Sequence, residues 1–223
     1  MKRITLIICI LFSLTSCEIQ YDGETKIAVT GKIIDENGNP ISNKDIQIVV
    51  LDGPGLILPS SDLISFGKSD QNGNFTLIFP APRDGNRISI SINDIINQFD
   101  AYQSKNIIAN KKNLENYKLD LKNLILYKNE SIKTLKLILN PTSPNKQIKD
   151  IQIEGKQPNM HIDLVEYPTQ NNNPLINTSY HVIKNQTIAL KYTIIDYSNN
   201  GATATNSVSI PIGNDPVNYT ITY

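Results

Sequence analysis

Apolar and polar residues alternate with a period of two along most of this chain. The clearest run is residues 87–92, in which isoleucines alternate with arginine and serine. A half-buried strand has this period because successive side chains point to opposite faces. Apolar and polar residues also alternate in segments 46–48, 75–77, 151–153, 187–196 and 208–212. Only residues 94–99 and part of 107–117 could form a helical turn or two, so the sequence predicts an all-β chain.

Asn, Pro and Gly clusters separate these segments, as they do between the strands of β-sandwiches. More than a dozen short strands over about 200 residues exceed the needs of one seven-stranded sandwich. We therefore predict two β-sandwich domains in tandem, at 26–128 and 129–223, the second of them Ig-like. The boundary could instead lie near Asn140.

The N-terminus has the layout of a secretory signal. Lys2 and Arg3 form a basic start, and residues 4–14 are an uncharged run of apolar and small residues. This run is too short to cross a bilayer as a helix.

The segment Leu14-Thr15-Ser16-Cys17 resembles the bacterial lipobox, whose cysteine is acylated and becomes the new N-terminus. We expect residues 1–16 to be removed as a lipoprotein signal peptide, Cys17 to carry the lipid, and residues 17–25 to form a tether. The alternative is an ordinary cleaved signal followed by a chance cysteine.

Net charge and cysteine content argue against nucleic-acid binding, electrostatic membrane binding and a disulfide-stabilised fold. Removal of Lys2 and Arg3 from a chain with 21 basic and 21 acidic residues leaves 19 against 21, a net charge of −2. This balance provides neither a nucleic-acid footprint nor a polybasic membrane patch. Cys9 lies in the removed segment and an acylated Cys17 cannot form a disulfide, so the fold must be stable without one.

The motif D-x-N-G-N occurs twice, at residues 35–39 and 70–74. A calcium-binding EF-hand loop needs Gly at its sixth position and Glu at its twelfth. The first copy has Pro40 and Ile46 there, and the second has Phe75 and Ala81. Both copies are therefore predicted to be tight turns, in which Asn and Gly tolerate positive φ and Asp caps the turn.

These turns and the strands around them resemble one family, the carboxypeptidase-regulatory-like domain, over residues 26–127. The matching positions are Gly31, Asp35, Gly38 and Pro40, the aliphatic strand 46–50, and Asp70, Gly73 and Phe75. The resemblance implies a transthyretin-like seven-stranded sandwich, common in cell-envelope proteins of the Bacteroidota, that serves as an accessory module without catalytic residues. A long connection at 52–65 and a polar insertion at 94–112, before a closing strand at 119–127, depart from the pattern.

No arrangement of residues predicts catalysis, a metal site or a cofactor. The mature chain has no free cysteine, no G-x-S-x-G motif and two histidines, His161 and His181, on probable strands. Asp163 and Glu166 could complete a metal site with them, but the spacing matches no recognised one. We interpret both histidines as surface or edge residues.

Candidate binding residues lie in the longest irregular segments, because sandwiches usually bind through loops. The first loop is 52–65 and the second is 171–180. With no tryptophan in the chain, exposed tyrosines are the available aromatic contacts, although packing in a β-fold explains most tyrosines equally well. The candidates are Asp52, Ser60, Asp62, Tyr167, Asn172, Tyr180 and Tyr197.

Together these features predict a non-catalytic lipoprotein of the outer membrane. It would be a binding or assembly module for a cell-envelope protein or polysaccharide, held to the membrane by its lipid. The alternative is a carboxylate-based hydrolase of the glycosidase class, whose test is the separation of two carboxyl groups in space. The periplasmic face and the cell surface both remain open as its location.

Overall fold

The computed structural model describes residues 19–52, 60–83, 85–94, 100–166 and 176–223. Within these ranges the chain forms fourteen β-strands and three short 3-10 helices, η1 (Lys111–Asn113), η2 (Asn129–Ser131) and η3 (Tyr197–Asn199), and no α-helix. The all-β prediction is confirmed. Each segment predicted as a strand from its alternation lies inside an observed strand.

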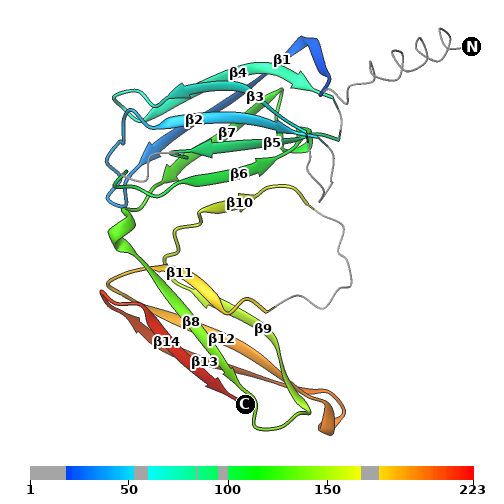
Figure 1. Ribbon diagram of the computed structural model, residues 1–223, viewed down its shortest axis with the longest axis vertical. Coiled ribbons are helices and arrows are strands. Elements are labelled where there is room, and N and C mark those ends of the chain that lie inside the picture. The colour runs from blue at the N-terminus through cyan, green and yellow to red at the C-terminus, as the bar shows by residue number, and fades with distance from the viewer. Residues whose placement is uncertain (1–18, 53–59, 84, 95–99, 167–175) are drawn as a thin grey trace, which may run out of the picture.

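The first sheet pair is the upper one in Figure 1 and is built mainly from the N-terminal half. One sheet has the order β4-β1-β7 and the other the order β10-β6-β5-β2-β3. Their bounds are β1 (Tyr21–Ile34), β2 (Asp45–Leu51), β3 (Ser61–Lys68), β4 (Asn74–Pro82), β5 (Arg87–Ile92), β6 (Lys105–Ala109), β7 (Lys118–Ile125) and β10 (His161–Asp163).

Residues from both sheets of this pair form one core, as in a β-sandwich. On β2, Ile46, Ile48 and Val50 are buried while the residues between them are not. On β4 the same alternation buries Phe75, Leu77 and Phe79. Burying one such side chain contributes roughly 2 kcal/mol of transfer free energy, so the alternation selects which face of each strand lies inward.

The second sheet pair lies below the first and contains the sheets β11-β8-β14 and β13-β12-β9. Its bounds are β8 (Ile132–Asn140), β9 (Lys146–Glu154), β11 (Ser179–Ile183), β12 (Gln186–Asp196), β13 (Ala202–Ile212) and β14 (Val217–Thr222).

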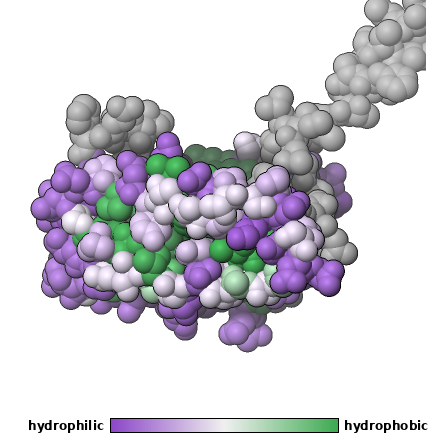
Figure 2. Space-filling model, turned by 90° about the horizontal axis from the view of Figure 1, so that it is seen from below, coloured by the Kyte–Doolittle hydropathy of each residue, from purple (hydrophilic) through white to green (hydrophobic). Residues whose placement is uncertain are grey.

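The second core is smaller and less enclosed than the first. It has 9 buried residues and 11 partly buried ones, against 18 and 6 in the first core. Figure 2 looks at the molecule from below and shows apolar side chains in green among polar ones in purple. Two three-stranded sheets are too narrow to cover every inward-facing side chain, so we expect this pair to be the less stable of the two.

The two D-x-N-G-N turns link the two sheets of the first pair and have the same geometry. In the first, Asp35 Oδ1 accepts hydrogen bonds from the backbone N–H groups of Asn37 (2.9 Å) and Asn39 (2.8 Å). Asp70 Oδ1 makes the equivalent bonds to Asn72 and Asn74, both at 2.8 Å.

The tight turns predicted from the sequence are thus present, with one difference in their backbone. Gly38 (φ +85°) and Gly73 (φ +77°) have positive φ, whereas Asn37 and Asn72 do not. Each turn is a three-residue loop whose last position is left-handed, and glycine takes that position at least cost.

The chain returns to the first pair between β9 and β11. There β10 pairs in parallel with β6, His161 facing Asn106 and Asp163 facing Ile108 in the register. This strand lies within the range predicted as the second domain, so residues of that range complete a sheet of the first pair.

Two buried side chains hold this returning segment in place. Gln103 Nε2 donates to the carbonyl oxygen of Pro158 (2.8 Å). Lys105 Nζ donates to the carbonyl oxygens of Pro158 (3.0 Å) and Asn159 (2.6 Å). Burial of the ammonium group lowers the pKa of Lys105 from its ordinary value of 10.5 to about 8.

The stability of the fold is expected to rise with pH as Lys105 loses its proton. Below pH 8 the side chain is charged in both states, and above 10.5 it is neutral in both. Between these values the unfolded chain binds more protons, so the free energy of unfolding increases, by at most about 3 kcal/mol. Urea unfolding at a series of pH values measures this, with Lys105→Met as the control. Parallel pH profiles for the two proteins would contradict the assignment.

Candidate binding site

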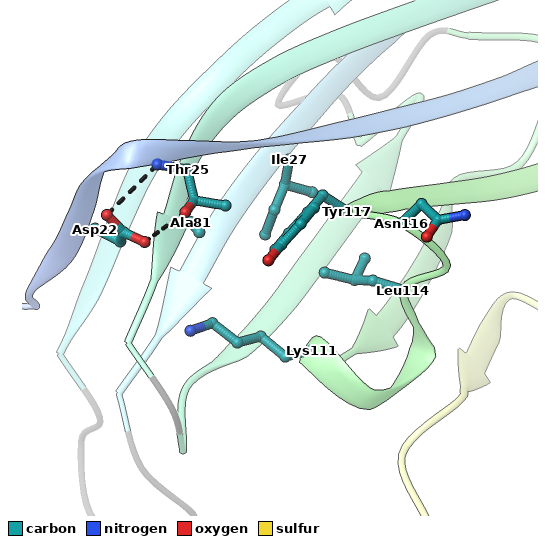
Figure 3. Close-up of a pocket in the computed structure, with 8 residues that line it drawn as sticks. All are labelled: Asp22, Thr25, Ile27, Ala81, Lys111, Leu114, Asn116 and Tyr117. Atoms are coloured by element: carbon teal, nitrogen blue, oxygen red, sulfur yellow. Dashed lines mark hydrogen bonds between the residues drawn. The ribbon is translucent and has the colours of Figure 1, made fainter.

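A hollow of about 440 Å³ opens at the end of the first sheet pair where β1, β4 and η1 meet. Figure 3 shows its lining. Ile27, Ala81 and Leu114 supply apolar surface, and the polar side is formed by Asp22, Thr25, Lys111, Asn116 and Tyr117. The lining is thus more polar than apolar, and its polar groups could orient a ligand. We call it the Tyr117 hollow.

Tyr117 has a backbone conformation that its side chain disfavours. Asn116 (φ +48°) and Tyr117 (φ +60°) are the two central residues of a tight hairpin. The hairpin is closed by two backbone hydrogen bonds of 2.9 Å, one in each direction, between Glu115 and Lys118. A turn with positive φ at both central residues normally has Gly at the second, because a left-handed conformation costs a bulky residue about 1–2 kcal/mol.

Packing in the core does not explain the presence of Tyr117. Its side chain remains 63% exposed, and its ring borders the hollow. Strained residues of this kind are concentrated at functional sites, where the side chain compensates for the cost of the backbone.

Neighbouring segments fix the position of the hairpin. The N–H of Ala28 on β1 donates to the carbonyl oxygen of Tyr117 (3.0 Å). Asn110 caps η1 by accepting from the N–H of Lys112, and the side chain of Asn113 donates to the carbonyl oxygen of Leu164 (2.8 Å). The segment after β10 therefore contributes to the support of the site.

Asp22 supplies a negative charge at the opposite side of the hollow. Its carboxylate accepts hydrogen bonds from the Thr25 hydroxyl (2.5 Å) and the Glu24 N–H (3.0 Å). The bond from Thr25 is the main reason that the pKa of Asp22 lies below its ordinary value, with a smaller contribution from the charge of Lys111. The hollow thus presents a carboxylate, an ammonium and a phenol.

A second hollow, of about 540 Å³, adjoins the first on the other side of the hairpin, and Asn116 lines both. It contains two carboxylates, Glu115 and Asp120. Asp120 is paired with Lys122 (2.7 Å), whose hydrogen bond lowers the pKa of the Asp120 carboxyl. A glycosidase acid needs a raised pKa, so Asp120 is unsuited to that role.

Part of the predicted set of site residues can be located in the fold. Cys17, Tyr167 and Asn172 lie outside the described residues. The loop predicted at 52–65 is shorter than expected, because β3 begins at Ser61.

The first predicted loop has defined polar contacts at its ends. The N–H of Asp52 donates to the carbonyl oxygen of Ser60 (2.9 Å). The hydroxyl of Tyr21 donates to Asp62 Oδ2 (2.8 Å).

Tyr180 and Tyr197 belong to the second sheet pair. Tyr180 lies in β11, packs against the second core and donates its hydroxyl to the carbonyl oxygen of Asn177 (2.9 Å). Tyr197 begins η3 and is 57% exposed. Tyr197 is therefore the more accessible of the two as a surface contact.

Sequence reasoning did not identify Tyr117. The Asn116-Tyr117 pair carries a turn signal in its asparagine, but it lacks the glycine that marks such turns. Its partners Asp22 and Lys111 are 95 and 6 residues away along the chain, so only the fold brings them together.

The histidines lie as predicted on strands. His161 is on β10 and His181 is on β11, and both are exposed. In the described part of the chain, no three His, Cys, Asp or Glu residues gather closely enough to hold a metal ion. The same residues contain no helix with the length and apolar character needed to cross a membrane.

Comparisons with known proteins leave the family open. No family model matches the chain, and no curated protein matches it. Among solved structures, a shaft pilin SpaA mutant from Lactobacillus rhamnosus GG aligns over 89% of this chain and 98% of its own, with 8% identity and a TM-score of 0.35.

Two further solved structures show similarly weak likeness. The Bacillus anthracis TIE protein aligns over 89% of this chain and 34% of its own, with 13% identity and a TM-score of 0.33. A 9R-lipoxygenase from Cyanothece PCC8801 has 18% identity and a TM-score of 0.32 over 54% of this chain, which spans 20% of that enzyme's length. TM-scores this low do not allow a function to be transferred from these proteins to this chain. The molecule is an all-β protein with β-sandwich character, and its function must be argued from its own site.

Proposed function

We propose that this chain is an outer-membrane lipoprotein that binds a saccharide unit of a cell-envelope polysaccharide without catalysing a reaction. In this proposal Cys17 carries the lipid, the first sheet pair is a carboxypeptidase-regulatory-like sandwich, and the second pair is an Ig-like sandwich. The observation that carries it is Tyr117, an exposed aromatic residue kept at a strained position beside a hollow.

The chemistry of the Tyr117 hollow suits a sugar ring. An exposed aromatic ring such as that of Tyr117 can pack against the C–H face of a sugar, and charged groups can bond its hydroxyls. The Asp22 carboxylate and the Lys111 ammonium provide such groups. The adjoining hollow across the hairpin offers space for a second unit, as a polysaccharide requires.

The site also lies close to the proposed anchor. Asp22 is five positions after Cys17, which limits the distance between them to about 18 Å even in a fully extended chain. The hollow would therefore face material near the membrane surface.

Carboxyl pKa values favour binding over hydrolysis. Among the described residues, each Asp whose pKa is displaced has it displaced downward: Asp22, Asp35, Asp70, Asp100, Asp120 and Asp196. A glycosidase of the alternative hypothesis needs one carboxyl that holds its proton near neutral pH. The downward shifts are typical of carboxylates that accept hydrogen bonds in turns and ion pairs.

Replacing Tyr117 with glycine is expected to abolish saccharide binding without loss of stability. Glycine relieves the left-handed strain, so the free energy of unfolding should be unchanged or higher by up to about 1 kcal/mol. Ligands found on a glycan array can be titrated calorimetrically against both proteins, with at least a tenfold loss of affinity in the variant.

Two controls sharpen this test. Tyr117→Phe retains the ring and should retain most of the binding. Tyr197→Gly removes a similarly exposed tyrosine from the second pair and should leave binding unchanged. If no glycan binds, or if Tyr117→Gly binds as tightly as the unaltered protein, the proposed function is wrong.

A further inference from the structure

A smaller hollow, of about 190 Å³, lies where the returning segment crosses the end of β7. Its lining includes Lys105, Asn123, Leu124, Ile125, Pro158 and Ile162. We call it the Lys105 hollow. It shares no lining residue with the Tyr117 hollow.

Lys105 is a cation in an unusual place. The residue is 4% exposed, and its ammonium group has three N–H donors. Two of them bond the carbonyl oxygens of Pro158 and Asn159. Within the described ranges, no third acceptor and no carboxylate lies at bonding distance from Nζ. Lysine is almost never so buried unless it is paired with an anion.

Holding the returning segment does not require this charge. Gln103, also buried, donates from a neutral amide to the same carbonyl oxygen of Pro158 at 2.8 Å. A neutral donor at position 105 could bond the Asn159 carbonyl in the same way, at a lower cost of burial. The positive charge is therefore left without a structural role.

We propose that the Lys105 hollow binds a carboxylate that carries a short aliphatic chain. The carboxylate would accept the third N–H of Lys105 and neutralise its charge. Leu124, Ile125 and Ile162 would contact the aliphatic part, and the Asn123 amide lies at the same hollow as a further donor. A volume of about 190 Å³ has room for a chain of a few carbons.

Butyrate and N-acetylvaline are suitable probes, because they represent a free short-chain acid and the C-terminus of a peptide. Butyramide has the shape of butyrate without its charge. Calorimetric titration into the full chain should give a Kd on the order of 1 mM for at least one carboxylate. Butyramide should bind at least tenfold more weakly, and which acid binds better identifies the source.

Substitutions in the lining test whether the carboxylate binds in the Lys105 hollow. Ile125→Trp fills the hollow while leaving Lys105 in place, and should weaken carboxylate binding at least tenfold. Ile138→Trp is the matched control, since Ile125 (38%) and Ile138 (46%) are both partly exposed isoleucines on strands, and Ile138 lies in the second pair. Lys105→Met should also abolish binding, and Ile125→Trp keeps the test valid if Lys105→Met fails to fold.

Three outcomes would overturn the proposal. In the first, neither carboxylate binds at up to about 50 mM, well above the expected Kd. In the second, butyramide binds as well as butyrate. In the third, Ile125→Trp and Ile138→Trp bind the carboxylate equally.

Discussion

Replacing Gly73 with alanine is expected to destabilise the protein by about 4 kcal/mol, whereas the same change at Gly38 should cost about 1 kcal/mol. The two glycines occupy the same position of two equivalent turns, with φ of +77° and +85°. They therefore share the cost of placing an L-residue in the left-handed region.

Their surroundings differ. A Cβ atom on Gly73 would lie 2.3 Å from the carbonyl oxygen of Ile33, while a Cβ on Gly38 would meet no heavy atom within 4 Å. Ile33 accepts from the N–H of Ile41 (3.0 Å) and donates its own N–H to Gly73 (2.8 Å). Relieving the clash must displace backbone and weaken both bonds, each worth about 1 kcal/mol.

Urea unfolding followed by circular dichroism measures both variants. The difference between them isolates the contacts of the added Cβ with Ile33 and Pro40, because the backbone cost is common to the two. Equal losses of stability in the two variants would contradict the close contact between position 73 and the Ile33 carbonyl oxygen.

Replacing Cys17 with alanine is expected to move the protein almost completely from the membrane to the soluble fraction. Each buried acyl CH₂ contributes about 0.8 kcal/mol to membrane attachment, so two or more chains anchor firmly. The expected mature chain has a net charge of −2 and no polybasic patch to replace them. The lipid would be the whole anchor.

Cys9→Ala is the matched control, because Cys9 lies in the segment expected to be removed. Its product should be acylated and remain with the membrane. Fractionation of cells that express each variant, with metabolic labelling by a fatty-acid probe, reports both properties. Membrane retention of Cys17→Ala after a high-salt wash would exclude lipid anchoring through this residue.

Local patterns along the chain were sufficient for the strands with clear alternation and for the two turns. They missed the starts of β1 at Tyr21 and β3 at Ser61, which fall in the predicted tether (17–25) and loop (52–65), and β6, which falls in the predicted insertion (94–112). The alternation in β2, β4 and β5 determines which side chains are buried, because a strand directs successive residues to opposite faces. Each Asp of the two turns bonds backbone N–H groups no more than four residues away, so the place of each turn and its Asp cap could be predicted without the rest of the fold. The Gly positions carry the positive φ that such loops need.

Tertiary structure alone decided the candidate sites and the course of the chain. Asp22 meets Lys111 and Tyr117 only because β1 and β7 pair in parallel, a contact between segments about 90 residues apart. The return of β10 to β6 and the burial of Lys105 likewise depend on distant segments. Alternation specifies the face of a strand but not its partner, since many pairings bury the same apolar residues. The sequence by itself therefore determined the alternating strands and the two turns, and long-range packing decided the remaining elements and which segments lie side by side.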